Sequence, residues 1–140
     1  MGSVFEKLNL KDHREIVVLN APLSFEAQLT ALSGVTVRRD LRKVKVISFA
    51  LVFATRQKEV DGMSQVLADK LKGDALLWFA YPKGSSKKYA CDFNRDTGWT
   101  AMRRLGFDTV RAVAIDDDWS ALRFRRVAFI KSAVTSTQGF

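Results

Sequence analysis

Residues 74–88, DALLWFAYPKGSSKK, decide the fold. The run 76–81 is apolar throughout, so a strand here has no polar face and must be covered on both sides. Such strands occur in the middle of largely parallel sheets that carry helices above and below. Pro82 ends the strand, and a basic loop follows at the carboxyl edge of the sheet, where ligands of open α/β folds bind.

The composition is that of a globular domain. With 140 residues and 47% hydrophobic content, we expect one domain over residues 1–131 and a disordered tail at 132–140. The amino terminus is charged and has no secretory pattern, and no apolar run approaches the ~20 residues of a spanning helix. Cys91 is the single cysteine, which suits a reducing compartment. We therefore expect a cytoplasmic, bacterial-type protein.

Apolar patterns divide the part of the chain before this strand. Strands are expected at 15–20, 35–39 and 47–54, and helices from Ser24 to 33 and from Thr55 to Gly73. The joint at 40–46 is too short for a crossover helix, because a parallel crossover usually takes a dozen residues. Either these residues cross in extended form or the two flanking strands pair antiparallel. We favour the extended crossover.

The end of the chain predicts a helix and a hairpin. A helix is expected over about 96–105, with Trp99 and Met102 facing inward. Strands at 107–115 and 119–130 flank the acidic turn 116–118, which predicts an antiparallel hairpin. A β-bulge at Arg125–Arg126 would bring Leu122, Phe124, Val127 and Phe129 to one face.

This order of elements predicts a three-layer, Rossmann-like α/β fold whose mostly parallel sheet is closed by an antiparallel C-terminal hairpin. It resembles an abbreviated methyltransferase sheet, in which the last strand inserts antiparallel beside its neighbour. Four stretches also resemble an uncharacterised family of small bacterial α/β proteins, a domain of unknown function. They are VLNAP (18–22), YPKGSSKKY (81–89), RDTGW (95–99) and DDDWSALRFR (116–125). The resemblance implies a compact domain and supplies no catalytic residue.

The turn after the first strand tests for cofactor binding. Dinucleotide and methyl-donor sites use glycines there, so that backbone N–H groups can approach the ligand. The turn in this chain contains no glycine, and it begins with Asn20, Ala21 and Pro22. Asp40 follows the second strand, where an acidic ribose ligand would stand. A degenerate methyltransferase-like domain would keep a small-molecule crevice around Asn20, Asp40, Thr55 and Tyr81.

The basic loop is the stronger candidate site on sequence alone. Glycine allows unusual backbone angles, serines offer hydroxyl and N–H groups, and lysines supply charge for a phosphate group or a nucleic-acid backbone. The loop residues are Lys83, Gly84, Ser85, Ser86, Lys87 and Lys88. The formal net charge of +8 favours a phosphate-bearing partner. The leading hypothesis is therefore a non-enzymatic binding or regulatory module for such a partner.

The other charged groups are weaker candidates for a functional site. Arg123 and Arg125 share one face of the hairpin and could bind single-stranded nucleic acid, but ion pairs with the aspartates 116–118 are the favoured interpretation. His13 is the only histidine, and consecutive aspartates in a tight turn point apart, so we expect no metal site and no resident cofactor. A protein-interaction module is the third hypothesis, and the oligomeric state stays open.

Overall fold

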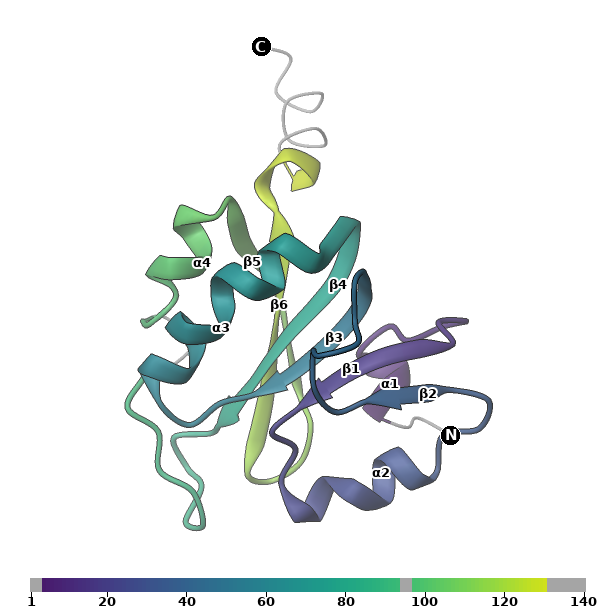
Figure 1. Cartoon of the computed structure of the whole chain (residues 1–140). Helices are drawn as coiled ribbons and strands as arrows, with labels where there is room; N and C mark the ends of the chain where they lie inside the picture. The colour runs from purple at the N-terminus through teal and green to yellow at the C-terminus, as the bar shows by residue number, and fades with distance from the viewer. Residues whose placement is uncertain (1–3, 94–96, 131–140) are drawn as a thin grey trace.

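The computed structural model describes residues 4–93 and 97–130, which form one sheet with helices on both faces (Figure 1). The strands are β1 (Glu15–Leu19), β2 (Thr36–Arg38), β3 (Ile47–Phe53), β4 (Leu71–Pro82), β5 (Phe107–Ala114) and β6 (Trp119–Arg126). Their order is β2-β1-β3-β4-β6-β5. The first four strands run parallel, and β6 is antiparallel to both β4 and β5. The predicted three-layer α/β fold is confirmed.

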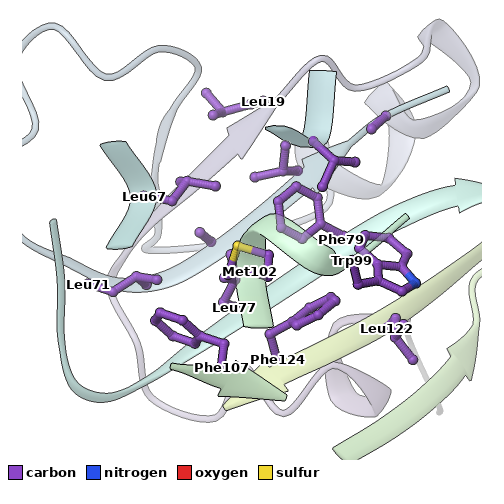
Figure 2. Close-up of a cluster of buried hydrophobic side chains, with 14 of the residues drawn as sticks. Leu19, Leu67, Leu71, Leu77, Phe79, Trp99, Met102, Phe107, Leu122 and Phe124 are labelled. Carbon is purple, nitrogen blue, oxygen red and sulfur yellow. The ribbon is translucent and has the colours of Figure 1, made fainter. Parts of the chain in front are cut away.

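Two apolar cores cover the two faces. On one face lie α1 (Val4–Lys7), the short 3₁₀ helix η1 (Leu23–Phe25) and α2 (Glu26–Thr30); on the other lie α3 (Gln57–Lys70) and α4 (Thr100–Arg104). Figure 2 shows the second core, in which Met102 and Trp99 pack against Phe79 and Phe124. Nothing in the sequence analysis predicted α1, whose Phe5 seals the opposite core.

The central strand behaves as its sequence predicts. Leu77 and Phe79 face α3, whereas Trp78 and Ala80 face α1, and all four are fully buried. Trp78 is also satisfied as a donor, because its indole N–H bonds to the carbonyl oxygen of Leu8 at 3.0 Å. Covering by two helical layers is what a strand without a polar face requires.

The joint between β2 and β3 crosses without a helix. Both strands pair parallel with β1, which lies between them, so the chain crosses without a helix and the antiparallel alternative is wrong. The crossing is not extended throughout, because it contains a turn in which the Val44 N–H bonds to the carbonyl oxygen of Leu41 at 3.2 Å. Val44 anchors the crossing: its side chain is buried, and its carbonyl oxygen accepts a bond from Lys70 Nζ at 2.6 Å.

Two predicted helix boundaries are wrong. Helix α3 ends at Lys70 and β4 begins at Leu71, so Gly73 lies inside a strand, where its positive φ of 57° accompanies a register shift against β3. Helix α4 begins at Thr100, not at Asp96, which lies outside the described residues. Trp99 and Met102 are nevertheless fully buried, as predicted.

The predicted bulge is on the wrong strand. The register shift falls in β5, between Thr109 and Arg111, and β6 ends at Arg126 without one. Arg126 donates to the carbonyl oxygens of Ala68 and Leu71 at the end of α3, and the chain then turns helical over 127–130. Leu122 and Phe124 are buried as expected, but Phe129 is 37% exposed.

In the ranges 4–93 and 97–130, no helix is long and apolar enough to cross a membrane. The predicted disordered tail, 132–140, lies outside the described residues.

Candidate functional site

The predicted site residues lie at the carboxyl edge of the sheet: Tyr81 is near the end of β4, and the others follow strand ends. There β1 ends at Leu19, β2 at Arg38, β3 at Phe53 and β4 at Pro82. Open α/β sheets bind ligands at this edge, because several strands deliver loops there from one direction.

Asn20 occupies the first turn in the left-handed conformation, with φ of 60°. Asparagine is one of the few residues other than glycine that adopts it readily. Its amide reaches toward the carbonyl oxygen of Phe53 at 3.4 Å, which ties the ends of β1 and β3 together. The turn thus has one backbone feature of a glycine loop, but it keeps a side chain at the position where a ligand backbone contact would form.

Asp40 stands two residues beyond the end of β2. Its carboxylate accepts bonds from the backbone N–H of Arg42 at 3.1 Å and from the Arg42 guanidinium at 3.0 Å. These bonds lower the pKa of Asp40, so it is ionised at neutral pH. The Arg42 side chain is 86% exposed, and an ion pair so exposed is easily replaced.

Asn20 and Asp40 line one crevice. Its volume is about 330 Å³, and its remaining walls are formed by Leu19, Arg39, Leu41, Met63 and Val66. The positive charge of Arg39 does not balance Asp40, because the Arg39 guanidinium forms a two-pronged ion pair with Glu26 at 2.8 Å. An ionised carboxylate therefore faces a mostly apolar wall provided by the crossing segment and α3.

Thr55 and Tyr81 do not share this crevice, and the prediction that all four residues surround it is wrong. The Thr55 N–H and hydroxyl both bond to Glu59 Oε1, and Thr55 lines a hollow of about 430 Å³ with Arg56 and Lys88. Tyr81 lines a larger hollow of about 790 Å³. Neither hollow shares a lining residue with the crevice.

The basic loop is folded onto the hairpin turn. The Ser86 hydroxyl donates to Asp118 Oδ1 at 2.9 Å and accepts the backbone N–H of Lys88 and Tyr89 at 3.3 and 3.2 Å. Lys88 Nζ is 4.0 Å from the same carboxylate. The Ser86 hydroxyl therefore holds the loop in place, and one of its three lysines is close to a counter-charge.

Gly84 does not use the freedom that glycine provides. Its φ is outside the left-handed region, and a Cβ at this position would meet no atom within 4 Å. The expectation that this residue supplies an unusual backbone angle is wrong. Ser85 and Lys87 are exposed, whereas Lys83 is half-buried at the rim of the largest hollow.

The largest hollow contains groups that the sequence analysis did not assign to a site. Ser120 and Ala112 of the hairpin form its wall with Tyr81, and Cys91 lies at its rim. Burial raises the pKa of the Cys91 thiol, which keeps it protonated at neutral pH. Met63 and Val66 of the crevice were likewise missed. The helical spacing of Met63 marks it as inward-facing, but no sequence signal shows that this end of the helix borders a cavity.

The start of α3 is not an anion site. The Gln57 N–H bonds to Asp92 Oδ1 at 2.6 Å, and Glu59 accepts the N–H groups of Thr55 and Arg56. Two carboxylates of the chain thus occupy the positions that a phosphate would take at a helix start. Among the described residues no group of three or more His, Cys, Asp or Glu side chains could hold a metal ion.

Comparison with known proteins supports the fold. No family model and no curated protein matches the chain, so membership of the uncharacterised bacterial family stays a prediction. Among solved structures, an S-adenosylmethionine-dependent methyltransferase from Aquifex aeolicus superposes with a TM-score of 0.62 at 12% identity, covering 89% of this chain and 88% of the other. The N-methyltransferase NodS from Bradyrhizobium japonicum gives 0.55 at 11% identity, covering 88% and 92%.

The glycopeptide N-methyltransferase MtfA gives a TM-score of 0.54 at 8% identity, covering 88% of this chain and 93% of the other. Structural similarity at identities this low shows a shared fold and does not identify a ligand. The chain has the Rossmann-like fold of S-adenosylmethionine-dependent methyltransferases.

Proposed function

We propose that the chain is a small-molecule-binding domain that holds an adenosyl compound of the S-adenosylmethionine type in the crevice between Asn20 and Asp40. The observation that carries the proposal is that these two residues follow neighbouring parallel strands, β1 and β2, and line one cavity. The similarity to methyltransferase structures adds support at the level of the fold.

The crevice fits the nucleoside part of such a ligand. The ionised Asp40 can accept hydrogen bonds from both ribose hydroxyls after displacing the exposed Arg42 side chain. Leu41, Met63 and Val66 offer an apolar wall for the base. The volume of about 330 Å³ is at the lower end of the range, ~300–1,000 Å³, of small-molecule pockets.

The amino-acid part of S-adenosylmethionine fits less well. A glycine loop would let backbone N–H groups approach it, and this chain has Asn20, Ala21 and Pro22 there. The nucleoside is therefore the part we expect to be recognised, and adenosine should retain most of the affinity of the full cofactor. No residue is assigned a catalytic role.

Replacing Asp40 by asparagine tests the proposal. The change keeps the size of the side chain but removes the charged acceptor, and a hydrogen bond to a charged group contributes about 1.5–3 kcal/mol. We expect the affinity for S-adenosylhomocysteine, measured by isothermal titration calorimetry, to fall roughly 10- to 100-fold. Asp117→Asn, an exposed aspartate in the hairpin turn, is the matched control and should bind like the wild type. Equal affinities for D40N and D117N would exclude the assigned ribose contact.

A second candidate function follows from the largest hollow. Lys83 stands at its rim, and the adjoining hollow brings Arg56 and Lys88 together beside Asp92, whose carboxylate already accepts the Gln57 N–H. The basic side chains, and not the start of α3, would therefore bind a phosphate-bearing ligand or a nucleic acid. The two hollows share Tyr89, Ala90 and Cys91, so one ligand could extend across both.

Alanine at Lys83, Lys87 and Lys88 together tests this second function. If the loop binds the phosphates of ATP, the triple variant should lose binding in the same calorimetric assay, whereas D40N should keep it. A control with the same change in charge replaces the exposed Lys45, Lys58 and Lys72. Unchanged ATP affinity in the loop variant, or equal losses in both triple variants, would rule out a loop-specific site.

A further inference from the structure

The β5–β6 ribbon carries three arginines on the face that also carries α1. Arg123 pairs with Trp78 across to β4, and Arg111 pairs with Arg123 across to β5. Trp78 faces α1, and residues directly opposite in a sheet share a face. Arg125 lies two residues after Arg123 on the same strand and therefore on the same side.

The bulge in β5 is what adds the third arginine. Thr109 pairs with Phe124, and regular pairing would then place Val110 opposite Arg123 and send Arg111 to the other face. The register shift at Val110 places Arg111 opposite Arg123 instead. Bulges commonly re-aim a side chain in this way.

These arginines do not pair with the turn aspartates, contrary to the interpretation favoured from sequence. Their ion-pair partner is Asp74. The Arg125 guanidinium donates two hydrogen bonds to the Asp74 carboxylate, at 2.9 and 2.7 Å, whereas Arg123 Nη2 lies 3.8 Å from it. Asp108, opposite Arg125, pairs with Arg103 at 3.4 Å. The face is therefore left with more positive than negative charge.

The excess positive charge is least favourable at Arg123, which is the most buried of the three arginines. Its side chain is only 18% exposed, and its Nε is buried and lacks a hydrogen-bond partner among the described residues. Burial lowers the pKa of Arg123; the nearby Asp74 carboxylate raises it, and the positive charges of Arg125 and Arg111 lower it again. A buried guanidinium N–H without an acceptor is unfavourable, and an oxyanion bound at the accessible part of this cluster, beside the exposed Arg111, would offset the surplus of positive charge.

A fourth cation extends the row. The Lys7 ammonium of α1 bonds to the carbonyl oxygen of Ala114 at 2.8 Å, at the far end of the ribbon. From Ala114 to Asp108, which pairs with Arg125, the row covers roughly 20 Å at ~3.3 Å per residue. These residues line none of the hollows described above, and an open, elongated row of cations suits a charged polymer better than an enclosed small molecule.

We infer that this face, with Arg111, Arg123, Arg125 and Lys7, binds the phosphate backbone of a nucleic acid. Guanidinium groups match phosphate oxygens with paired hydrogen bonds, and the net charge of +8 favours the encounter. Trp78, the aromatic side chain opposite Arg123, is fully buried, so contacts to phosphate and not base stacking would supply the affinity along this row. The inference is independent of the adenosyl crevice, which lies at the other end of the sheet order, between β1 and β2.

Arg111→Ala tests the inference, because Arg111 is exposed and its loss should not unfold the chain. The probe is a fluorescein-labelled single-stranded 20-mer followed by anisotropy at 50 and 200 mM salt. Loss of one phosphate contact should weaken binding roughly fivefold to tenfold at 50 mM salt and reduce the salt slope by about 0.7. Arg104→Ala, an exposed arginine on α4 with the same change in charge, should weaken binding less than twofold.

Three results would overturn the inference. Equal losses in R111A and R104A would indicate unspecific charge attraction. Loss of binding in the Lys83, Lys87 and Lys88 variant with none in R111A would move the contact to the basic loop. Competition by polyglutamate as strong as by unlabelled oligonucleotide would indicate an acidic protein as the partner.

Discussion

Replacing Trp99 by alanine should remove about 3–5 kcal/mol of folding free energy, the range for large aromatic residues in cores. Trp99 is fully buried, and its ring centroid lies 5.0 Å from that of Phe124, 5.1 Å from Phe93 and 5.7 Å from Phe79. Because domains of this kind are stable by only ~5–15 kcal/mol, the variant should be close to unfolding.

Urea unfolding followed by circular dichroism measures this loss. Leu23→Ala is the control, since Leu23 is 87% exposed and its truncation should change stability by no more than about 0.5 kcal/mol. If W99A unfolds outright, Trp99→Phe keeps a ring and should show a smaller loss. A loss below about 1 kcal/mol for W99A would mean that α4 does not seal this face as described.

Gly98→Ala should cost about 2–4 kcal/mol, although it adds one methyl group. Gly98 has φ of 92°, where an L-residue pays roughly 1–2 kcal/mol. Its new Cβ would stand 2.8 Å from Phe93 Cβ and would collide with the side-chain oxygen of Gln57. Gln57 could move only by giving up its bond to the Gly98 carbonyl oxygen, 2.6 Å long, which ties α3 to this segment.

The matched control is Gly84→Ala in the basic loop. Its Cβ would meet nothing within 4 Å, and its φ is compatible with alanine, so G84A should be neutral or stabilise by up to about 1 kcal/mol. Melting temperatures of the two variants separate the cases. Similar melting points for G98A and G84A would show that the contact between α3 and Gly98 is not formed in solution.

The fold follows from local patterns to a large extent. The apolar run in β4 has no polar face, and this alone requires two covering layers, which the structure provides. The helix–strand boundary at Lys70 and Leu71 could not be predicted, because Gly73 looks like a helix stop and only pairing with Ile47 extends the strand backward. The bulge was predicted on the wrong strand, because the Arg126 side chain is held by the carbonyl oxygens of Ala68 and Leu71, more than 50 residues away in the sequence.

The candidate site was predicted only at the level of the sheet edge. Asn20 and Asp40 come together because their strands are direct neighbours, which the order of elements suggests. Thr55 also follows a neighbour of β1, but Glu59 of α3 engages it. Ser86 was expected to face a ligand, and its capture by Asp118, 32 residues further along, is a tertiary contact that no local pattern announces.

The most direct test of the proposed crevice is a methyl NMR spectrum of methionine-labelled protein, recorded while S-adenosylhomocysteine is added. Met63 lines the crevice, whereas Met102 is fully buried on the inner face of α4 and serves as an internal reference. A ligand in the crevice should shift the Met63 methyl resonance in proportion to occupancy and leave Met102 in place. If the ligand binds without shifting Met63, or if saturating ligand changes neither resonance, the adenosyl crevice is the wrong assignment.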